Sequence, residues 1–138
     1  MKSLLVIIAS LISLAGYGQG RIDVVVTNIK VLQGDVRVGL FNNEKDFLEK
    51  PIEGKVVKVT SGEAVVSFEG LPDGDYAVSI FHDENSNQEL DKNMIGVPTE
   101  GFAFGNNAMG TFGPPSFEKA KVTIKGNSVR QEVALKHF

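Results

Sequence analysis

Hydrophobic residues recur at every second position through most of this chain. The period is clear in residues 22–27, 36–41 and 76–81, where β-branched and aromatic residues alternate with other types. Further strands of this kind are expected at residues 55–60, 63–68, 122–124 and 129–135. Such alternation is typical of strands with one buried face. The sequence therefore predicts an all-β fold, an antiparallel β-sandwich of about seven strands.

Turn-forming residues separate these runs. Ser61-Gly62 is expected to form a tight hairpin between two strands, and proline and glycine in 72–74 are expected to form a turn. A single helical turn capped by Asn43 is expected at 43–48. Residues 82–117 contain no clear strand, and a loop of this length in a small domain is commonly functional.

The N-terminus has the pattern of a signal peptide. Lys2 precedes an apolar stretch at residues 4–14, and Gly16-Tyr17-Gly18 supplies small residues before a cleavage site. A membrane anchor and a buried strand are the alternatives. Export with cleavage predicts a signal peptide at 1–18 and one domain at 19–138. After removal of the signal peptide, the domain is expected not to span a membrane and to be located in the periplasm or outside the cell.

Composition narrows the classes of function. The chain has 17 acidic and 14 basic residues, a formal net charge of −3, so the basic surface expected of a nucleic-acid-binding protein is missing. It contains no cysteine, so a hydrophobic core must stabilise it without disulfides. No nucleophile motif, phosphate loop or dinucleotide fingerprint occurs. We therefore expect a protein that is not an enzyme.

An acidic, amide-rich run follows the predicted strand at 76–81. Its side-chain oxygens are those of Asp83, Asn85, Asn87, Glu89 and Asp91. Alternating oxygens in a short loop can converge on a hard cation, so these five residues form a candidate calcium site. The alternative is a solvated turn, since Asp and Asn bond their own backbone in turns.

A second candidate site lies further along the same loop. Glu100, Phe102, Phe104, Asn106 and Asn107 combine aromatic faces with amide edges, which suit a carbohydrate or peptide ligand. The alternative is that the phenylalanines fill the core and the two asparagines form a turn.

A histidine precedes the acidic run. His82 is a possible metal ligand or catalytic base, but its one companion, His137, is distant in sequence. The alternative is an ordinary histidine at the end of a strand.

Three motifs carry a family resemblance. They are Gly-Leu-Pro-Asp-Gly-Asp-Tyr at 70–76, His-Asp-Glu-Asn-x-Asn at 82–87, and Glu-Gly-Phe-x-Phe-x-Asn-Asn at 100–107. Together they resemble the secreted bacterial family catalogued as domain of unknown function 2141, over nearly all of the mature chain. The first motif also resembles a strand entry in transthyretin-like sandwich modules, which is a fold-level analogy.

The chain departs from the family pattern in the acidic run. The family tends to read Asp-Glu-Asn-Gly-Asn-Gly, whereas Ser86 and Gln88 stand at the glycine positions here. The glutamate that closes an EF-hand-type loop is also replaced, by Met94. A calcium site in this loop is therefore expected to be weak.

These observations predict an exported, non-catalytic binding or interaction module, stabilised by calcium through 83–91. Its partner would be an unknown protein, peptide or carbohydrate, and no nucleic acid. The alternative is a structural or assembly protein of the cell envelope. A third possibility, an envelope hydrolase, has less support because no nucleophile or metal cluster is visible.

Overall fold

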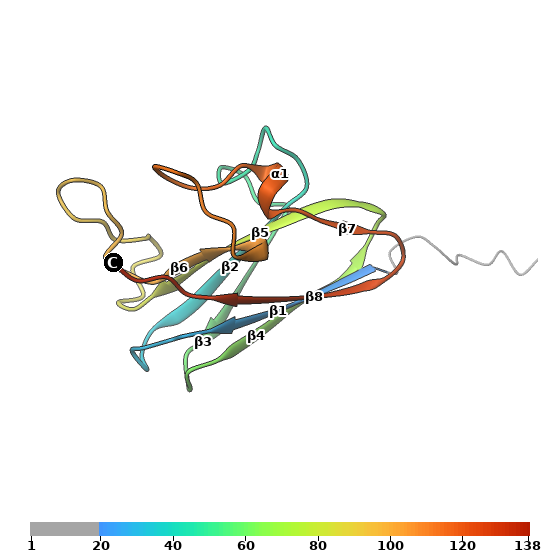
Figure 1. Ribbon diagram of the computed structural model, residues 1–138. Helices are drawn as coiled ribbons and strands as arrows, with labels where there is room; N and C mark the ends of the chain where they lie inside the picture. The colour runs from blue at the N-terminus through green and yellow to red at the C-terminus, as the bar shows by residue number, and fades with distance from the viewer. Residues whose placement is uncertain (1–19) are drawn as a thin grey trace, which may run out of the picture.

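The chain folds into two facing β-sheets (Figure 1). This computed structural model describes residues 20–138. The described chain has eight strands and one α-helix, so the predicted all-β sandwich is confirmed. The predicted signal peptide at 1–18 lies outside the described residues.

The first sheet, sheet A, has its N-terminal strand in the middle. β1 (Gly20–Thr27) lies between β4 (Ala64–Leu71) and β8 (Ser128–Ala134). β1 pairs with β4 in antiparallel fashion but with β8 in parallel, with Arg21 opposite Ser128 and Thr27 opposite Ala134. This parallel pair departs from the antiparallel arrangement that the sequence predicts.

The second sheet, sheet B, has the order β3-β2-β5-β6, with β7 paired to the beginning of β5. All of its pairings are antiparallel. Its strands are β2 (Asp35–Phe41), β3 (Glu53–Lys58), β5 (Gly74–Asp83), β6 (Phe102–Phe104) and β7 (Val122–Ile124).

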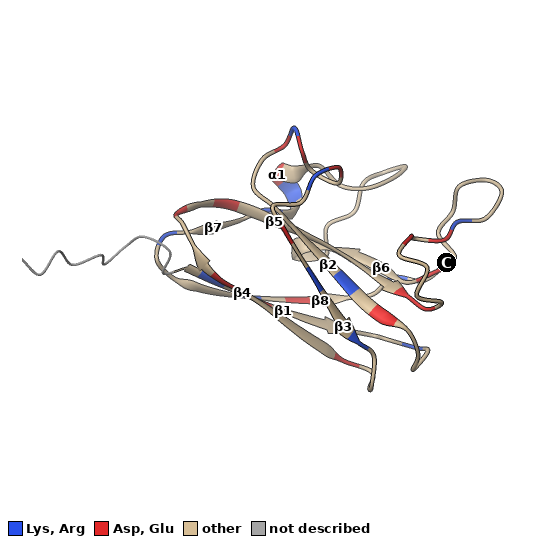
Figure 2. Cartoon of the chain, turned by 180° about the vertical axis from the view of Figure 1, so that it is seen from behind, with Lys and Arg blue, Asp and Glu red and all other residues tan. Residues whose placement is uncertain are grey.

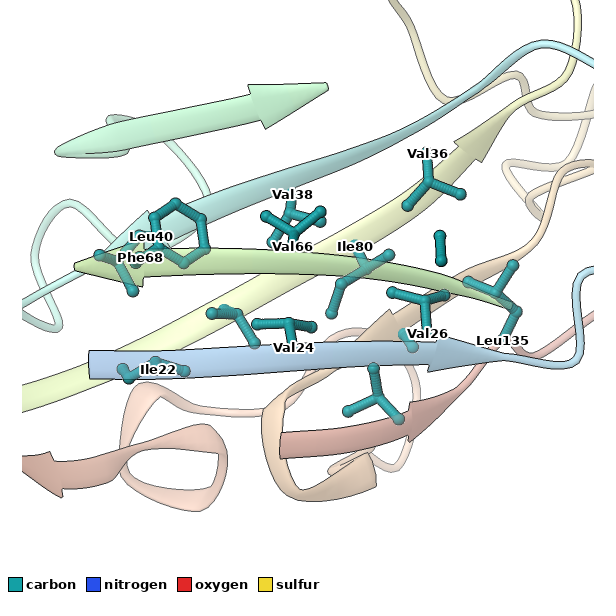
Figure 3. Packing of buried hydrophobic residues seen from close by; sticks show 14 of the residues in the cluster. Ile22, Val24, Val26, Val36, Val38, Leu40, Val66, Phe68, Ile80 and Leu135 are labelled. Atoms are coloured by element: carbon teal, nitrogen blue, oxygen red, sulfur yellow. The ribbon is translucent and has the colours of Figure 1, made fainter. Parts of the chain in front are cut away.

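The hydrophobic core fills the space between the sheets. Figure 3 shows Val24 and Val66 of sheet A in the same cluster as Val38 and Ile80 of sheet B. These residues occupy the alternate positions that the sequence pattern assigns to buried faces. Burial of each such side chain contributes about 1.5–3 kcal/mol relative to full exposure, so the alternation itself drives the stacking of the sheets.

Two connections differ from the sequence prediction. Ser61-Gly62 does not close a hairpin, because β3 pairs within sheet B and β4 within sheet A. The segment between them therefore crosses from one sheet to the other. Residues 43–48 form a turn instead of a helix, although Asn43 caps it as expected by accepting from the Asp46 N–H at 2.9 Å. Leu48 then takes a left-handed conformation, φ 66°, which ends the turn.

The long segment predicted as a strandless loop at 82–117 contains regular structure. Its first two residues complete β5, and β6 pairs with β5 in register Phe81–Phe102. A short 3₁₀ turn, η1 (Gly105–Asn107), follows β6, and α1 (Phe117–Ala120) begins after an N-cap at Ser116. What remains is two loops, 84–101 and 108–116.

Both loops lie over the outer face of sheet B, the face turned away from the core. At one end of this face, Phe117 and Ala120 of α1 pack with Phe41 and Ala77 in a second hydrophobic cluster. At the other end, loop 84–101 covers the end of β5, where the Asp83 side chain is fully buried. The middle of the face remains open between these two covers.

Candidate functional site

Asp83, the first residue of the candidate calcium site, is a buried anchor for loop 84–101. Its Oδ1 accepts from the Asn87 N–H at 3.1 Å, and its Oδ2 accepts from the Gln88 N–H at 2.8 Å and from Arg37 Nε at 3.0 Å. Burial disfavours the ionised form, but these three hydrogen bonds outweigh it, so the pKa of Asp83 lies below its ordinary value. The carboxylate therefore ties the loop to the sheet.

Glu100 anchors the other end of the same loop. Its side chain is buried, and its two oxygens accept from the Glu84 N–H at 2.7 Å and the Asp91 N–H at 2.8 Å. One carboxylate thus satisfies two backbone donors that strand pairing leaves free. Sequence analysis assigned Glu100 to ligand binding, whereas in the structure its oxygens hold the loop together.

The remaining polar residues of the acidic run bond to one another. Asn85 and Asn87 donate their amide groups to the two oxygens of Asp91, at 2.5 Å and 2.6 Å. The side-chain oxygen of Asn85 accepts from the Asn87 N–H, and that of Asn87 accepts from the Glu89 N–H. These are the Asx-type turns of the alternative reading.

This arrangement gives a cation few free oxygens. Asp83 faces three donors, and Asn85 and Asn87 present their amide nitrogens to Asp91. Among residues 20–138, no group of three or more His, Cys, Asp or Glu residues is placed to hold a metal ion. A calcium ion would have to displace the hydrogen bonds to Asp91, and calcium binding at 83–91 stays a prediction.

A groove opens on the outer face of sheet B, between the two covers. It has a volume of about 780 Å³, and its floor includes Ser79 and Phe81 of β5 and Phe102 and Phe104 of β6. Its walls come from three segments of the chain. They are loop 84–101 (Leu90, Lys92, Gly96, Val97, Pro98), loop 108–116 (Met109 to Pro114) and the C-terminal segment (Lys136, Phe138), with Leu48 at one end.

The predicted ligand-binding residues divide into two groups in the structure. Phe102 and Phe104 line the groove, as a ligand-binding role requires. Asn106 instead donates to the Lys119 and Lys121 carbonyls at 3.2 Å and 2.9 Å, and its N–H donates to the Gln131 side chain at 2.8 Å.

The side-chain amide of Asn107 forms hydrogen bonds with the backbone of β8, as a neighbouring strand would. Its Oδ1 accepts from the Ala134 N–H at 2.9 Å, and its Nδ2 donates to the Glu132 carbonyl at 3.3 Å. Both asparagines have positive φ, so they form the turn that the alternative reading described. Asn107 also borders a smaller hollow of about 260 Å³ that shares Phe102 and Phe104 with the groove.

The structure brings together two histidines that the sequence keeps apart. The ring Nε2–H of His82 donates to the Gln33 carbonyl at 2.6 Å, and the backbone N–H of His82 donates to the Gly101 carbonyl across the sheet. On the other side of β6, Phe102 pairs with Lys136. Gly101, the residue before Phe102, therefore lies between His82 on one side and His137, the residue after Lys136, on the other. A Cβ at Gly101 would lie 2.7 Å from the His137 ring, which therefore occupies the space that glycine leaves.

His82 is buried and His137 is half-buried, and the two rings make few hydrogen bonds. Within the described chain, neither ring nitrogen of His137 has a hydrogen-bond partner, nor does His82 Nδ1, which lies 3.9 Å from Glu84. Burial, with the positive charge of Lys30 and the proximity of His82, lowers the pKa of His137, while Glu84 opposes that shift. Sequence analysis missed the pair because β6, the strand beside Gly101, was not predicted.

Residues 24–132 match the family described as uncharacterized protein conserved in bacteria (DUF2141). The chain belongs to this family. No curated protein and no solved structure matches it.

The DUF2141 match runs from β1 into β8, so it contains both sheets, loop 84–101 and the floor of the groove. The resemblance that the three motifs carry is thus confirmed. The analogy with transthyretin-like modules stays a prediction. In the described part of this DUF2141 chain, no helix is both long and apolar enough to cross a membrane.

The two loop positions at which the resemblance led us to expect glycine share one backbone conformation. Ser86 and Gln88, which replace the expected glycines, both adopt left-handed conformations, with φ of 54° and 69°. Glycine takes this conformation without penalty, whereas a residue with a Cβ loses about 1–2 kcal/mol. Ser86 and Gln88 therefore hold a backbone conformation that glycine would adopt at a lower cost in free energy.

Proposed function

We propose that this DUF2141 protein is an exported, non-catalytic binding module whose groove takes an apolar ligand. The observation that carries the proposal is the groove itself. Ligand-binding pockets typically have volumes of about 300–1,000 Å³ with mostly apolar linings and a few polar groups. A groove of about 780 Å³ over Phe81, Phe102 and Phe104 agrees with that description.

The surroundings of the groove support an apolar ligand. Residues 101–117 contain no charged side chain, and Figure 2 shows the loop before α1 without blue or red segments. Phe112 lines the groove yet is fully exposed to solvent. Exposed aromatic surface beside a hollow is characteristic of an interaction site, because a bound ligand removes it from water.

The groove has a well-held frame. Asp83 and Glu100 fix loop 84–101 on one side, and the packing of Phe117 against Phe47 and Ala77 fixes the other. A preformed site spends less free energy on ordering when a ligand binds. A calcium ion at 83–91 would add to the stability of the same loop.

The chemistry of the lining favours binding over catalysis. Lys92 and Lys136 are the titratable side chains among the lining residues. General acid–base or nucleophilic catalysis needs two or more reactive groups within hydrogen-bond reach of one substrate atom. The apolar remainder of the lining fits retention of a ligand. Export is supported by the signal-peptide pattern of residues 1–18.

A neutral fluorescent dye such as Nile red tests the proposal. We expect saturable fluorescence enhancement, weakened several-fold by Phe112→Ser. Met94→Ser is the matched control, since Met94 is equally exposed but does not line the groove. Neither substitution removes buried contacts, so melting temperatures should stay unchanged. No saturable binding, or equal loss in both variants, would contradict the groove as the binding surface.

The alternative of an assembly role has one supporting feature. β3 and β4 each lie at one edge of their sheet, and each carries an exposed valine, Val56 and Val65. Free strand edges can pair with another chain, although Lys55 and Lys58 on β3 are the kind of charged residues that discourage it. Concentration-dependent oligomers in light scattering, lost with Val56→Lys, would favour assembly.

A further inference from the structure

We propose that the groove selects an anionic amphiphile, namely a free long-chain carboxylic acid, with its carboxylate at Lys92 and Lys136 and its hydrocarbon chain along the phenylalanine floor. This inference rests on the proposed function and names the class of ligand. It follows from the charges in the lining, from the shape of the hollow and from the pairing of β6.

The charged side chains of the lining are both cationic. Lys92 on loop 84–101 and Lys136 near the C-terminus line the groove, and no Asp or Glu does. Within residues 20–138 neither lysine has an ion-pair partner, whereas Lys55 and Lys121 each lie within 4.0 Å of a carboxylate. In a chain with an excess of acidic residues, two unpaired lysines beside an apolar hollow are complementary to an anionic head group.

The position of Lys136 suits a head group with a tail attached. Lys136 is paired with Phe102 across the sheet, and Phe138 packs on the Phe102 ring with centroids 5.7 Å apart. Cationic and aromatic groups are therefore neighbours at one part of the groove. Phe81 lies opposite Phe102 in the sheet, Phe104 continues the floor along β6, and the uncharged residues 109–114 line the same groove. This order of polar and apolar surface is the order along a carboxylic acid with a hydrocarbon tail.

A peptide is a poorer occupant. Peptides that bind along a sheet commonly add a strand to a free edge. The edge of β6 is already used, because Phe102 and Lys136 exchange both of their backbone hydrogen bonds, at 3.1 Å and 2.8 Å. A hydrocarbon chain needs no backbone partner and can be held by the phenylalanine rings alone.

A bilayer surface is also a poorer occupant. Phe81 and Phe104 are half-buried residues of the sheet, and loops 84–101 and 108–116 stand on either side of them. A flat membrane would meet the loop tips before it reached this floor. A single extended molecule can enter the hollow and cover both rings.

Calorimetric titration with three ligands of equal chain length tests the inference. Dodecanoate, dodecanol and dodecylamine differ in head-group charge, and each is used below the concentration at which it aggregates. We expect dodecanoate to bind most tightly and dodecylamine least. Each of Lys92→Gln and Lys136→Gln should weaken dodecanoate binding roughly threefold, the effect of one exposed ion pair, and should not weaken dodecanol binding. High salt should reduce the difference between acid and alcohol.

Lys45→Gln is the matched control, because Lys45 is exposed, has no ion-pair partner in the described chain and lies outside the groove. Equal affinity for acid and alcohol, with indifferent lysine variants, would overturn the inference and leave an apolar binding module standing. Failure of all three ligands together with Nile red would remove the binding module as well. The inference would also be overturned if the protein bound dodecanoate only in its aggregated form, or if the protein bound only to anionic vesicles.

Discussion

The Arg37 guanidinium donates to the Asp83 carboxylate at 3.0 Å, where the Asp83 side chain has no exposed surface. Arg37→Met removes the one cationic side chain that, among residues 20–138, forms an ion pair with this carboxylate. We expect a loss of about 1.5–3 kcal/mol in the free energy of unfolding, the range for a hydrogen bond to a charged group. Urea denaturation measures it. Arg130→Met, which breaks the exposed contact with Glu132 at 3.6 Å, should change stability by less than about 1 kcal/mol.

The Asp83 carboxylate also predicts that the stability of the protein depends on pH in the acid range. The pKa of Asp83 is lower in the folded chain than in the unfolded chain, because backbone N–H groups and Arg37 stabilise the ionised form against the effect of burial. Its contribution to stability is therefore present above its unfolded value of 3.8 and is lost as the pH falls through the lower folded value. Asp83→Asn should flatten the acid limb of stability measured against pH. An unchanged acid limb would contradict this assignment.

Glycine at positions 86 and 88 should stabilise the protein. Ser86 and Gln88 hold left-handed backbone conformations, which are unfavourable for residues with a Cβ. Ser86→Gly and Gln88→Gly remove this cost but raise the conformational entropy of the unfolded chain. We therefore expect the free energy of unfolding to rise by up to about 1 kcal/mol for each substitution. Thermal melting measures the gain. Gln88→Ala should give none, since alanine keeps the Cβ. Ser61→Gly, at a position without positive φ, should be neutral or destabilising.

The His137 ring predicts a second pH dependence, near neutrality. Burial, helped by Lys30 and His82, lowers the pKa of His137 below its ordinary value of 6.5. The folded state thus favours the neutral ring, and this contribution to stability is complete above pH 6.5 and is lost as the pH falls through the folded pKa. His137→Phe should reduce the change in the urea midpoint between neutral and mildly acidic pH. An identical slope in wild type and variant would refute it.

Glu100 should control the order of loop 84–101. Glu100→Gln replaces one acceptor oxygen with an amide that faces a backbone donor, either the Glu84 or the Asp91 N–H. We expect a loss of about 1–3 kcal/mol and faster hydrogen exchange at those two amides. Glu89→Gln, at an exposed position on the same loop, is the control and should leave both exchange rates unchanged.

Calcium binding at 83–91 has a direct thermal test. A weak site predicts a melting temperature that rises in millimolar calcium and falls with a chelator, with a gain of about 2.7 kcal/mol at a calcium concentration about 100 times the dissociation constant. Asp91→Asn should abolish the rise, because Asp91 receives the Asn85 and Asn87 amides that an ion would displace. Equal melting curves with calcium and chelator would rule the site out.

Sequence alternation predicted most of the core but not the pairing of the strands. Positions such as Val38, Val66 and Ile80 are buried as expected, since period two identifies a buried face whatever the neighbouring strand. For the same reason the sequence did not reveal that the chain crosses between the sheets at Ser61-Gly62. The hydrophobic residues of β3 and β4 would alternate in the same way whether the two strands lay in one sheet or in two. The parallel pairing of β1 with β8 joins residues more than 100 positions apart, as in Arg21 and Ser128, and no local pattern encodes it.

Two residues that line the candidate groove were singled out from the sequence. Phe102 and Phe104 were assigned to a ligand surface, and both line the groove. The strand that carries them is too short, at three residues, for alternation to reveal. The roles of Glu100 and Asn106 depend on backbone groups far along the chain, so their residue types suggested ligands where the structure has internal partners.

The central place of β1 has a consequence for how the chain is made. Its second neighbour, β8, spans Ser128–Ala134, so a ribosome must complete nearly the whole polypeptide before the first strand is flanked on both sides. Until then β1 is an open edge with unsatisfied backbone groups on its β8 side. Contacts this distant in sequence form slowly. Sheet A is therefore expected to be completed late, after the C-terminal strand β8 has been synthesised.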